Sequence, residues 1–183
     1  VLFIGAYSTG KTSFIRQLLG KEYLDSHIAP EPSTDRFNAL IYGDEEITVN
    51  GTVLTGLSHL PFQGLTHFGL DFINRMVATT VQSPILKHIN IIDTPGVLAG
   101  LKQANRGYDF GLVARWFGQR SDLIILMFDC SKTDISDELM ETISQLQDYH
   151  GRVRCVLNKV DMLDIKEIVR VYGALMWSLG RTI

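Results

Sequence analysis

Four stretches of the chain are largely apolar along their whole length instead of alternating between apolar and polar residues. A strand that is buried on both faces carries such a run, because neither of its faces meets water. We therefore expect these stretches to form the centre of a parallel sheet covered by helices. They are Val1–Ile4, Ile89–Ile92, Leu123–Phe128 and Val153–Leu157.

Apolar residues at helical spacing separate these strands and predict helices between them. Strands that alternate with helices are typical of a doubly wound α/β fold, with helices on both faces of a mostly parallel sheet. The region Phe37–Leu54 differs, because β-rich runs flank Asn50-Gly51, a pair suited to a type I′ turn. We expect a hairpin there and hence an antiparallel edge of the sheet. The predicted helices are Lys11–Leu19, Phe68–Val81, Phe110–Gln119, Asp134–Tyr149 and Ile165–Leu179.

Length and composition agree with one globular domain over residues 1–183. Of the 183 residues 45% are hydrophobic and 20% are charged, and no linker divides the chain. A net charge of −3 with scattered basic residues gives no electrostatic basis for nucleic-acid binding. No apolar run approaches the ~18 residues of a membrane-spanning helix. We expect a soluble cytoplasmic domain and, since the chain starts inside a strand and ends after an apolar helix, a fragment of a longer protein.

A glycine loop follows the first predicted strand and matches the phosphate-binding pattern GxxxxGK[ST]. Gly5 and Gly10 allow the backbone to curl around an anion, and the helix that opens near Lys11 adds the positive end of its dipole. We expect Lys11 to reach the β- and γ-phosphates of a nucleotide and the Thr12 hydroxyl to coordinate Mg²⁺. The candidate binding residues of this loop are Gly5, Tyr7, Ser8, Thr9, Gly10, Lys11, Thr12 and Ser13.

A second motif, Asp93-Thr94-Pro95-Gly96, follows the predicted strand Ile89–Ile92. At the carboxyl end of a strand, an aspartate can hold Mg²⁺ through water while a glycine peptide contacts the γ-phosphate. A plain loop that begins with an Asx-turn is the structural alternative. The proline-rich loop Ala29–Asp35 adds Thr34 as a further Mg²⁺ ligand, unless that loop is only a stiff connector. The candidate catalytic residues are Lys11, Thr12, Thr34, Asp93 and Gly96, of which Thr12, Thr34 and Asp93 would hold the metal.

A third motif, Asn158-Lys159-Val160-Asp161, follows another buried strand. The Asp161 carboxylate can accept from the N1–H and the exocyclic amine of guanine, the Lys159 stem can cover the base, and Asn158 can brace the loops. The alternative is that Asp161 caps the next helix. Taken alone, the motif therefore predicts GTP.

Several segments outside these general motifs resemble the nucleotide-binding domain of the EH-domain-containing ATPases, members of the dynamin superfamily. The resemblance covers nearly the whole chain, and the stretch Arg170–Gly180 is its most specific part, because no general rule of nucleotide binding requires that string. The other segments that carry it are Tyr7–Thr12, Pro30–Asp35, Arg106–Phe110 and Asp134–Glu138.

The resemblance implies ATP as the ligand in spite of the G-protein fold, with Met162 beside the adenine. It implies a homodimer through the C-terminal helix, with Trp177 at the interface, and an oligomer that remodels endosomal or plasma membranes in endocytic trafficking. Membrane contact would come from segments outside this chain. The helix Ile165–Leu179 is apolar nearly all round, so it needs cover on two sides, which either a partner chain or further segments of the same protein could supply.

The chain departs from the family pattern in three places, one of which is a shorter stretch, Leu98–Asn105, after Asp93–Gly96. Ala6 replaces the glutamine that follows the first loop glycine, and the Lys-Pro-Phe assembly loop reads Leu60-Pro61-Phe62, which keeps the apolar tip without the charge. We expect a Mg²⁺-dependent ATPase with slow hydrolysis that assembly accelerates. A GTP-binding switch and a scaffold that is locked by nucleotide without hydrolysing it are the alternatives.

Overall fold

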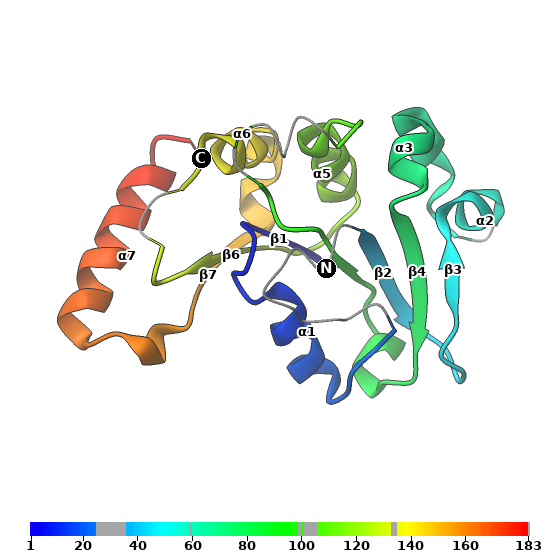
Figure 1. The fold of residues 1–183 in the computed structure, drawn as a ribbon, viewed down its shortest axis with the longest axis horizontal. Coiled ribbons are helices and arrows are strands. Elements are labelled where there is room, and N and C mark those ends of the chain that lie inside the picture. Colours follow the sequence, from blue (N-terminus) through cyan, green and yellow to red (C-terminus); the bar gives the residue numbers. More distant parts are fainter. Residues whose placement is uncertain (25–35, 59, 99, 101–105, 133–134, 183) are drawn as a thin grey trace.

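A mixed sheet with helices on both faces forms the body of the computed structural model (Figure 1). The structure describes residues 1–24, 36–58, 60–98, 100, 106–132 and 135–182. Among these residues seven strands pair in the order β3-β4-β2-β5-β1-β6-β7. Their bounds are β1 Leu2–Gly5, β2 Phe37–Tyr42, β3 Thr48–Asn50, β4 Met76–Val81, β5 Ile91–Asp93, β6 Ile124–Asp129 and β7 Val153–Asn158.

The sheet is mostly parallel, as predicted. β1 pairs in parallel with β5 and with β6, β6 pairs in parallel with β7, and β2 pairs in parallel with β4. The antiparallel edge is also confirmed, because the edge strand β3 runs against β4. A second antiparallel pair, β2 with β5, lies inside the sheet and was not predicted. It places Asn38 of β2 opposite Asp93 of β5.

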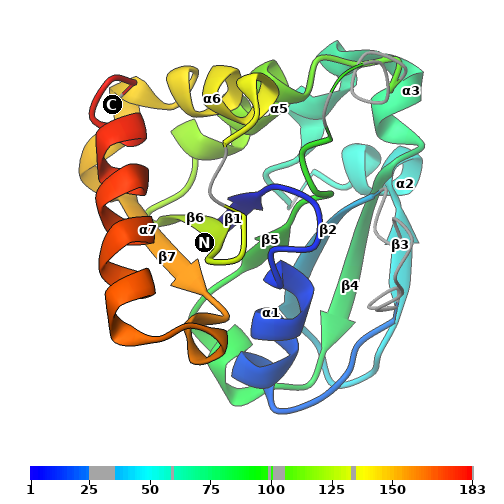
Figure 2. The same ribbon diagram turned by 60° about the vertical axis from the view of Figure 1, so that its left-hand side comes forward.

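Helices cover the two faces unequally (Figures 1 and 2). Helix α1 (Lys11–Leu19) and the short helix η2 (Pro84–Lys87) pack on one face, around Phe3, Ile15 and Leu40. The opposite face carries the larger core, in which the Phe37 ring meets Phe72 and Phe117. The elements on that side are α2 Gly51–Gly56, η1 Gln63–Phe68, α3 Gly69–Ile73, α5 Phe110–Gln119 and α6 Asp137–Ser144, followed by η3 Gln147–Arg152.

The predicted helix Phe68–Val81 is wrong in its second half. The chain forms only the short helix α3 and then turns into β4. Apolar residues at Phe72, Ile73 and Met76 fit a helical face, but the β-branched run that follows, from Val77 to Val81, packs better in a strand. Likewise the predicted helix Asp134–Tyr149 is an α-helix only over Asp137–Ser144, with Ser136 as its N-cap.

The predicted hairpin at Asn50-Gly51 is also wrong. β4 lies between β2 and β3 and pairs with both, so β2 and β3 do not pair with each other. Gly51 begins α2 and is not part of a turn. A Cβ atom at Gly51 would lie 2.2 Å from the Ile73 carbonyl oxygen. Glycine is therefore required there for close packing and not for a left-handed turn.

Helix α7 (Ile165–Leu179) lies beside the edge strand β7. Its start is fixed by a capping box, in which the Asp164 side chain and the Glu167 side chain each bond the other's backbone. Leu175 and Leu179 pack into the larger core, whereas Trp177 is 73% exposed. One face of α7 thus packs within the domain and the other face is exposed. This agrees with the prediction that a helix that is apolar nearly all round needs a second packing partner. No described helix is long and apolar enough to span a bilayer.

Candidate functional site

The carboxyl ends of β1, β5, β6 and β7 meet at one edge of the sheet, and the loops that follow them hold the predicted motifs. The loop after β1 bends through two left-handed residues, Ser8 with φ of 63° and Gly10 with φ of 92°. A Cβ atom at Gly10 would also lie 2.4 Å from Asn158 Nδ2. Gly10 is therefore required both by its backbone conformation and by the approach of the third motif.

Cationic and amide side chains bond successive carbonyl groups of this loop. Lys11 Nζ donates to the carbonyl oxygens of Gly5 and Ala6, at 3.1 Å each. Two of the three N–H groups of the ammonium thus donate to these carbonyl oxygens, and the third can donate to a phosphate oxygen. Further along the loop the donors come from distant parts of the chain. Lys132 Nζ donates to the Tyr7 carbonyl oxygen at 3.0 Å, and Lys159 Nζ donates to the Ser8 carbonyl oxygen at 2.9 Å. Asn158 Nδ2 donates to the Thr9 carbonyl oxygen at 2.9 Å.

Lys11 is 6% exposed, which is low for a charged side chain. Burial lowers the pKa of its ammonium group to about 8; Asp93 opposes this shift, while the positive charges of Arg106 and Lys132 add to it. A negative ligand next to Lys11 would restore the charged form. The loop is therefore a cationic concavity that favours an anion such as a phosphate.

Asp93 is the residue predicted to support the metal. Its Oδ2 atom accepts from the Thr12 hydroxyl at 2.8 Å and from the Tyr23 hydroxyl at 2.9 Å. Its Oδ1 atom is buried and has no hydrogen-bond partner among the described residues. Burial raises the pKa of Asp93, against the opposing effects of Lys11 and the two hydroxyl donors. A hydroxyl whose hydrogen is donated to a carboxylate keeps its oxygen lone pairs for a cation, and the second carboxylate oxygen is also available, so the pair suits the oxygen-rich shell of Mg²⁺.

The loop after Asp93 is tied to the glycine loop. Backbone hydrogen bonds join Val97 to Gly5 and to Tyr7, at 3.1 Å each. A Cβ atom at Gly96 would lie 2.5 Å from Tyr7 Cα, so only glycine fits. The Gly96 carbonyl accepts from Nη2 of the buried Arg106 at 2.6 Å. The two loops thus form one unit, in which Arg106 holds the glycine that is expected to contact the γ-phosphate.

The third motif lies beside the glycine loop but is more open. Lys159 has φ of 61°, and its Nζ also bonds Asp129 Oδ2 at 2.6 Å. Burial opposes the ionisation of Asp129, but hydrogen bonds from Lys159 and Ser131 outweigh it and hold the pKa of Asp129 below its usual value. Asp161 is exposed and Met162 is 66% exposed, both in the short helix η4 (Val160–Met162).

The structure thus brings together nearly all of the predicted site residues that it describes. Ser13 lies exposed in the first turn of α1, and Thr34 lies outside the described residues. Phe62, expected at the apolar tip of an assembly loop, is instead buried in the larger core. The residues gathered at this edge of the sheet are Gly5, Tyr7, Ser8, Thr9, Gly10, Lys11, Thr12, Asp93, Gly96, Asn158, Lys159, Asp161 and Met162.

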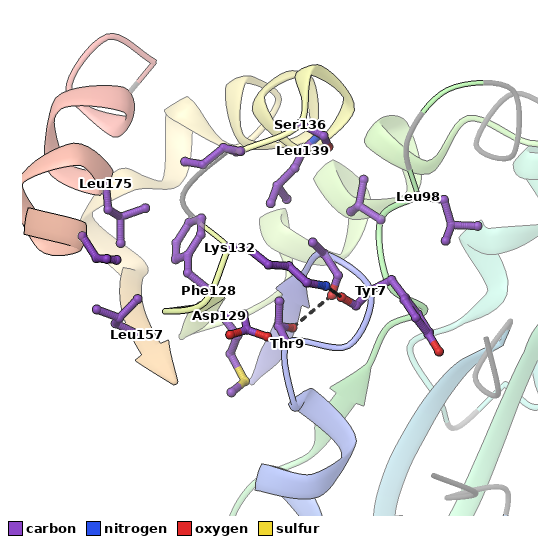
Figure 3. A pocket seen from close by; sticks show the side chains of 15 residues that line it. Tyr7, Thr9, Leu98, Phe128, Asp129, Lys132, Ser136, Leu139, Leu157 and Leu175 are labelled. Carbon is purple, nitrogen blue, oxygen red and sulfur yellow. Dashed lines mark hydrogen bonds between the residues drawn. The ribbon is translucent and has the colours of Figure 1, made fainter. Parts of the chain in front are cut away.

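A cavity of about 460 Å³ lies between the glycine loop and the helices α6 and α7 (Figure 3). Its walls are mainly apolar, with Leu139 of α6, Leu157 of β7 and Leu175 of α7 among them. Lys132 extends along it toward the loop at Tyr7 (Figure 3). Ala6 also lines it, at the position where the family pattern has glutamine.

Sequence reasoning missed four polar residues of this region. Asp129 ends a buried strand, so the rule that revealed Asp93 would have found it too. Asn38 stands out as an amide within an apolar run. Tyr23 and Lys132 carry no local signal, because only the tertiary fold brings their side chains to Asp93 and Tyr7.

The sheet order, the glycine loop and the lysine on its carbonyl groups define the class: a nucleotide-binding domain of the phosphate-loop type with the architecture of G proteins. The chain belongs to the dynamin family, whose family model matches residues 1–160.

Relatives and solved structures agree with this assignment. The chain is 50% identical to EH domain-containing protein 2 of Homo sapiens and 46% identical to EH domain-containing protein 1 of Arabidopsis thaliana, over 184 aligned residues in each case. Both matches cover 100% of this chain and 34% of the relative, so the chain spans about a third of their length. The predicted resemblance to the EH-domain-containing family is confirmed.

Similar structures extend the fold to more distant proteins. An oligomerised bacterial dynamin superposes with a TM-score of 0.59 at 18% identity, over 97% of this chain and 28% of that one. The protein Era, solved with MgGDPNP and ribosomal RNA, superposes with a TM-score of 0.53 at 18% identity, over 96% of this chain and 45% of that one. At such identities the likeness supports the fold.

Proposed function

We propose that residues 1–183 form one nucleotide-binding domain that binds Mg²⁺-ATP and hydrolyses it slowly, faster after assembly. The observation that carries the proposal is the cationic loop next to the Thr12–Asp93 pair, because it offers a phosphate site and a metal site side by side. ATP is favoured over GTP by the resemblance to the EH-domain-containing ATPases, a family to which the 50% identity with EH domain-containing protein 2 links this chain. The exposed Asp161 keeps GTP as the second candidate.

In the proposed reaction a water oxygen attacks the γ-phosphorus in line, and the bond to the β–γ bridging oxygen breaks, which gives ADP, phosphate and a proton. Lys11 and the N–H groups of the loop stabilise charge on the phosphoryl oxygens. Arg106 keeps Gly96 against the loop. Thr12, Thr34 and Asp93 would hold Mg²⁺, which would neutralise phosphate charge. Ala6 offers the attacking water no polar side chain, so slow hydrolysis is expected.

Assembly is proposed to use α7. Its open face carries a stripe of exposed apolar side chains at helical spacing, and Trp177 is the largest of them. Burying such a stripe against a second copy is favourable. The stripe consists of Ile165, Val169, Tyr172, Met176 and Trp177. Membrane remodelling and a cytoplasmic location on endosomal or plasma membranes are proposed from the family resemblance; the bacterial dynamin neighbour is described as sensing and tethering membranes.

The rate of ATP hydrolysis, measured at increasing protein concentration, tests both the proposed hydrolysis and the proposed assembly through α7. We expect the rate per domain to rise as dimers form, and Trp177→Ala to abolish that rise while nucleotide binding is kept. Leu70→Ala is the matched control, since Leu70 is 75% exposed on α3, away from α7. A rate per domain that is measurable but independent of concentration would contradict the role of assembly. Nucleotide binding without any turnover would favour the locked scaffold.

A further inference from the structure

Asn38 is a polar residue where an apolar one is expected. It lies in β2, between Phe37 and Ala39, and is 3% exposed. Neither its side-chain nitrogen nor its side-chain oxygen has a hydrogen-bond partner among the described residues. Buried amides are almost always paired, so such a residue calls for an explanation.

Alternation along β2 shows which face Asn38 occupies. Phe37 and Ala39 belong to the larger core, whereas Leu40 packs with Ile15 on the α1 face. Because side chains alternate along a strand, Asn38 lies on the same face as Leu40. This is the face of α1 and hence of the phosphate loop.

Asp93 lies on the same face, directly opposite. The strand register pairs Asn38 with Asp93, and the Asp93 side chain meets Thr12 of α1. Directly opposite residues of antiparallel strands have Cβ atoms about 4.5–5.5 Å apart. Asp93 Oδ1 is likewise buried and has no hydrogen-bond partner among the described residues. An amide and a carboxylate oxygen that both lack a partner among the described residues therefore belong to side chains that lie opposite each other on the same face of the sheet.

We propose that Asn38 is a positioning residue for Asp93. One ordered water accepts a hydrogen bond from Asn38 Nδ2 and donates one to Asp93 Oδ1. The bridge orients the carboxylate so that Oδ2 faces the Thr12 hydroxyl, which is the arrangement that the metal site needs. The inference rests on the proposed Mg²⁺-nucleotide site, and it adds a residue to that site from a strand that carries none of the predicted motifs.

The test is the Mg²⁺ concentration needed for half-maximal binding of a fluorescent ATP analogue to the whole chain, together with the melting temperature of the nucleotide-free protein. Asn38→Leu keeps the branching of the side chain and removes its polar atoms. We expect the Mg²⁺ requirement to rise about tenfold, as is typical when a group that orients a metal ligand is lost. The melting temperature should not rise, since Asp93 Oδ1 loses its bridge.

Two further variants complete the design. Thr79→Val is the matched control, because Thr79 is a buried polar residue on the neighbouring strand β4 that bonds Thr48, and it should leave the Mg²⁺ requirement unchanged. In an Asp93→Asn background, Asn38→Leu should add little, because Asn38 acts through Asp93. If Asn38→Leu does not fold, Asn38→Ala is used for the same Mg²⁺ titration.

An unchanged Mg²⁺ requirement in Asn38→Leu, with a melting temperature raised by several degrees, would overturn the inference and leave Asn38 as an amide that nothing uses. The proposed function would survive that result. A wild-type chain without any Mg²⁺-dependent nucleotide binding would overturn the proposed function instead, and this inference with it.

Discussion

The phosphate end and the base end of the site are built in different ways. At the phosphate end Lys11 is 6% exposed and donates to the carbonyl groups that follow β1, and Asp93 is 1% exposed and accepts from Thr12 and Tyr23. At the base end Met162 is 66% exposed and Asp161 is also exposed. The phosphate end is therefore preorganised, so binding a nucleotide there costs little conformational entropy. Asn158 and Lys159 are bonded to the glycine loop, but Asp161 and Met162, which are expected to meet the base, are exposed, so base preference has less rigid support.

The largest effect should come from the phosphate end. Lys11→Met keeps the apolar stem and removes the charged hydrogen bond that the third N–H group donates to phosphate, worth about 1.5–3 kcal/mol, together with the attraction of the positive charge to the other phosphate oxygens. We expect nucleotide affinity to fall at least a hundredfold by calorimetry, while the nucleotide-free protein melts no lower, because a buried charge is removed. Lys21→Met is the control, since Lys21 pairs with Glu46 away from the loop. Equal losses in both variants would contradict the account.

Asp93→Asn should have the next largest effect. The amide keeps the shape of the side chain but loses the charge that supports the metal, so we expect the Mg²⁺ requirement for nucleotide binding to rise about 10–100-fold. Binding measured in a chelator should change little. If the metal-free affinity dropped as far as the metal-dependent one, Asp93 would be supporting the loop and not the metal.

Nucleotide binding should take up protons at mildly alkaline pH. The pKa of Lys11 is lowered to about 8, and a bound phosphate raises it again. At pH 8.5 we expect binding to take up a large part of one proton, and almost none at pH 7. Calorimetry in buffers with different ionisation enthalpies measures this number, and Lys11→Met removes the uptake from whatever binding remains.

The same shift makes a prediction for stability. Between about pH 8 and the unperturbed pKa of 10.5, the folded nucleotide-free chain binds fewer protons at Lys11 than the unfolded chain does. The contribution of Lys11 to the free energy of unfolding should therefore rise with pH across this window. A smaller rise in Lys11→Met, measured by denaturant titration, is the expected result, and an identical slope in both proteins would contradict it.

The smallest effect should be at the base end. If ATP is the ligand, Asp161→Asn should change ATP affinity less than tenfold, because adenine offers N1 as an acceptor and has no N1–H for the carboxylate. If GTP is the ligand, the same variant should lose a pair of hydrogen bonds to a charged group, on the order of a hundredfold. Fluorescent analogues of both nucleotides distinguish the two cases.

The phosphate end was predictable from the sequence because its chemistry is local. The loop from Gly5 to Thr12 is contiguous, and Asp93 is marked by the strand before it. The partners that complete it come from far along the chain: Tyr23, Lys132 and Arg106 reach the loops only through the tertiary fold. No spacing rule connects them.

The fold was predictable where one periodicity dominates, as in α1, α5 and α7. The prediction failed between residues 50 and 81, because the apolar residues of 68–76 fit a helix whereas residues 76–81 form a strand of the sheet. Gly51 was misread for a similar reason, because a glycine needed for close approach to Ile73 looks the same in sequence as a turn glycine. The parallel pairing of β2 with β4 depends on contacts that a local pattern does not contain.

Calorimetric titration of the chain with non-hydrolysable analogues of ATP and GTP, each with and without Mg²⁺, tests the central claim most directly. The account predicts Mg²⁺-dependent binding of the ATP analogue, weaker binding of the GTP analogue, and loss of both in Lys11→Met. Tight binding of the GTP analogue with no measurable binding of the ATP analogue would contradict the choice of base. Absence of binding by either analogue would contradict the nucleotide site itself.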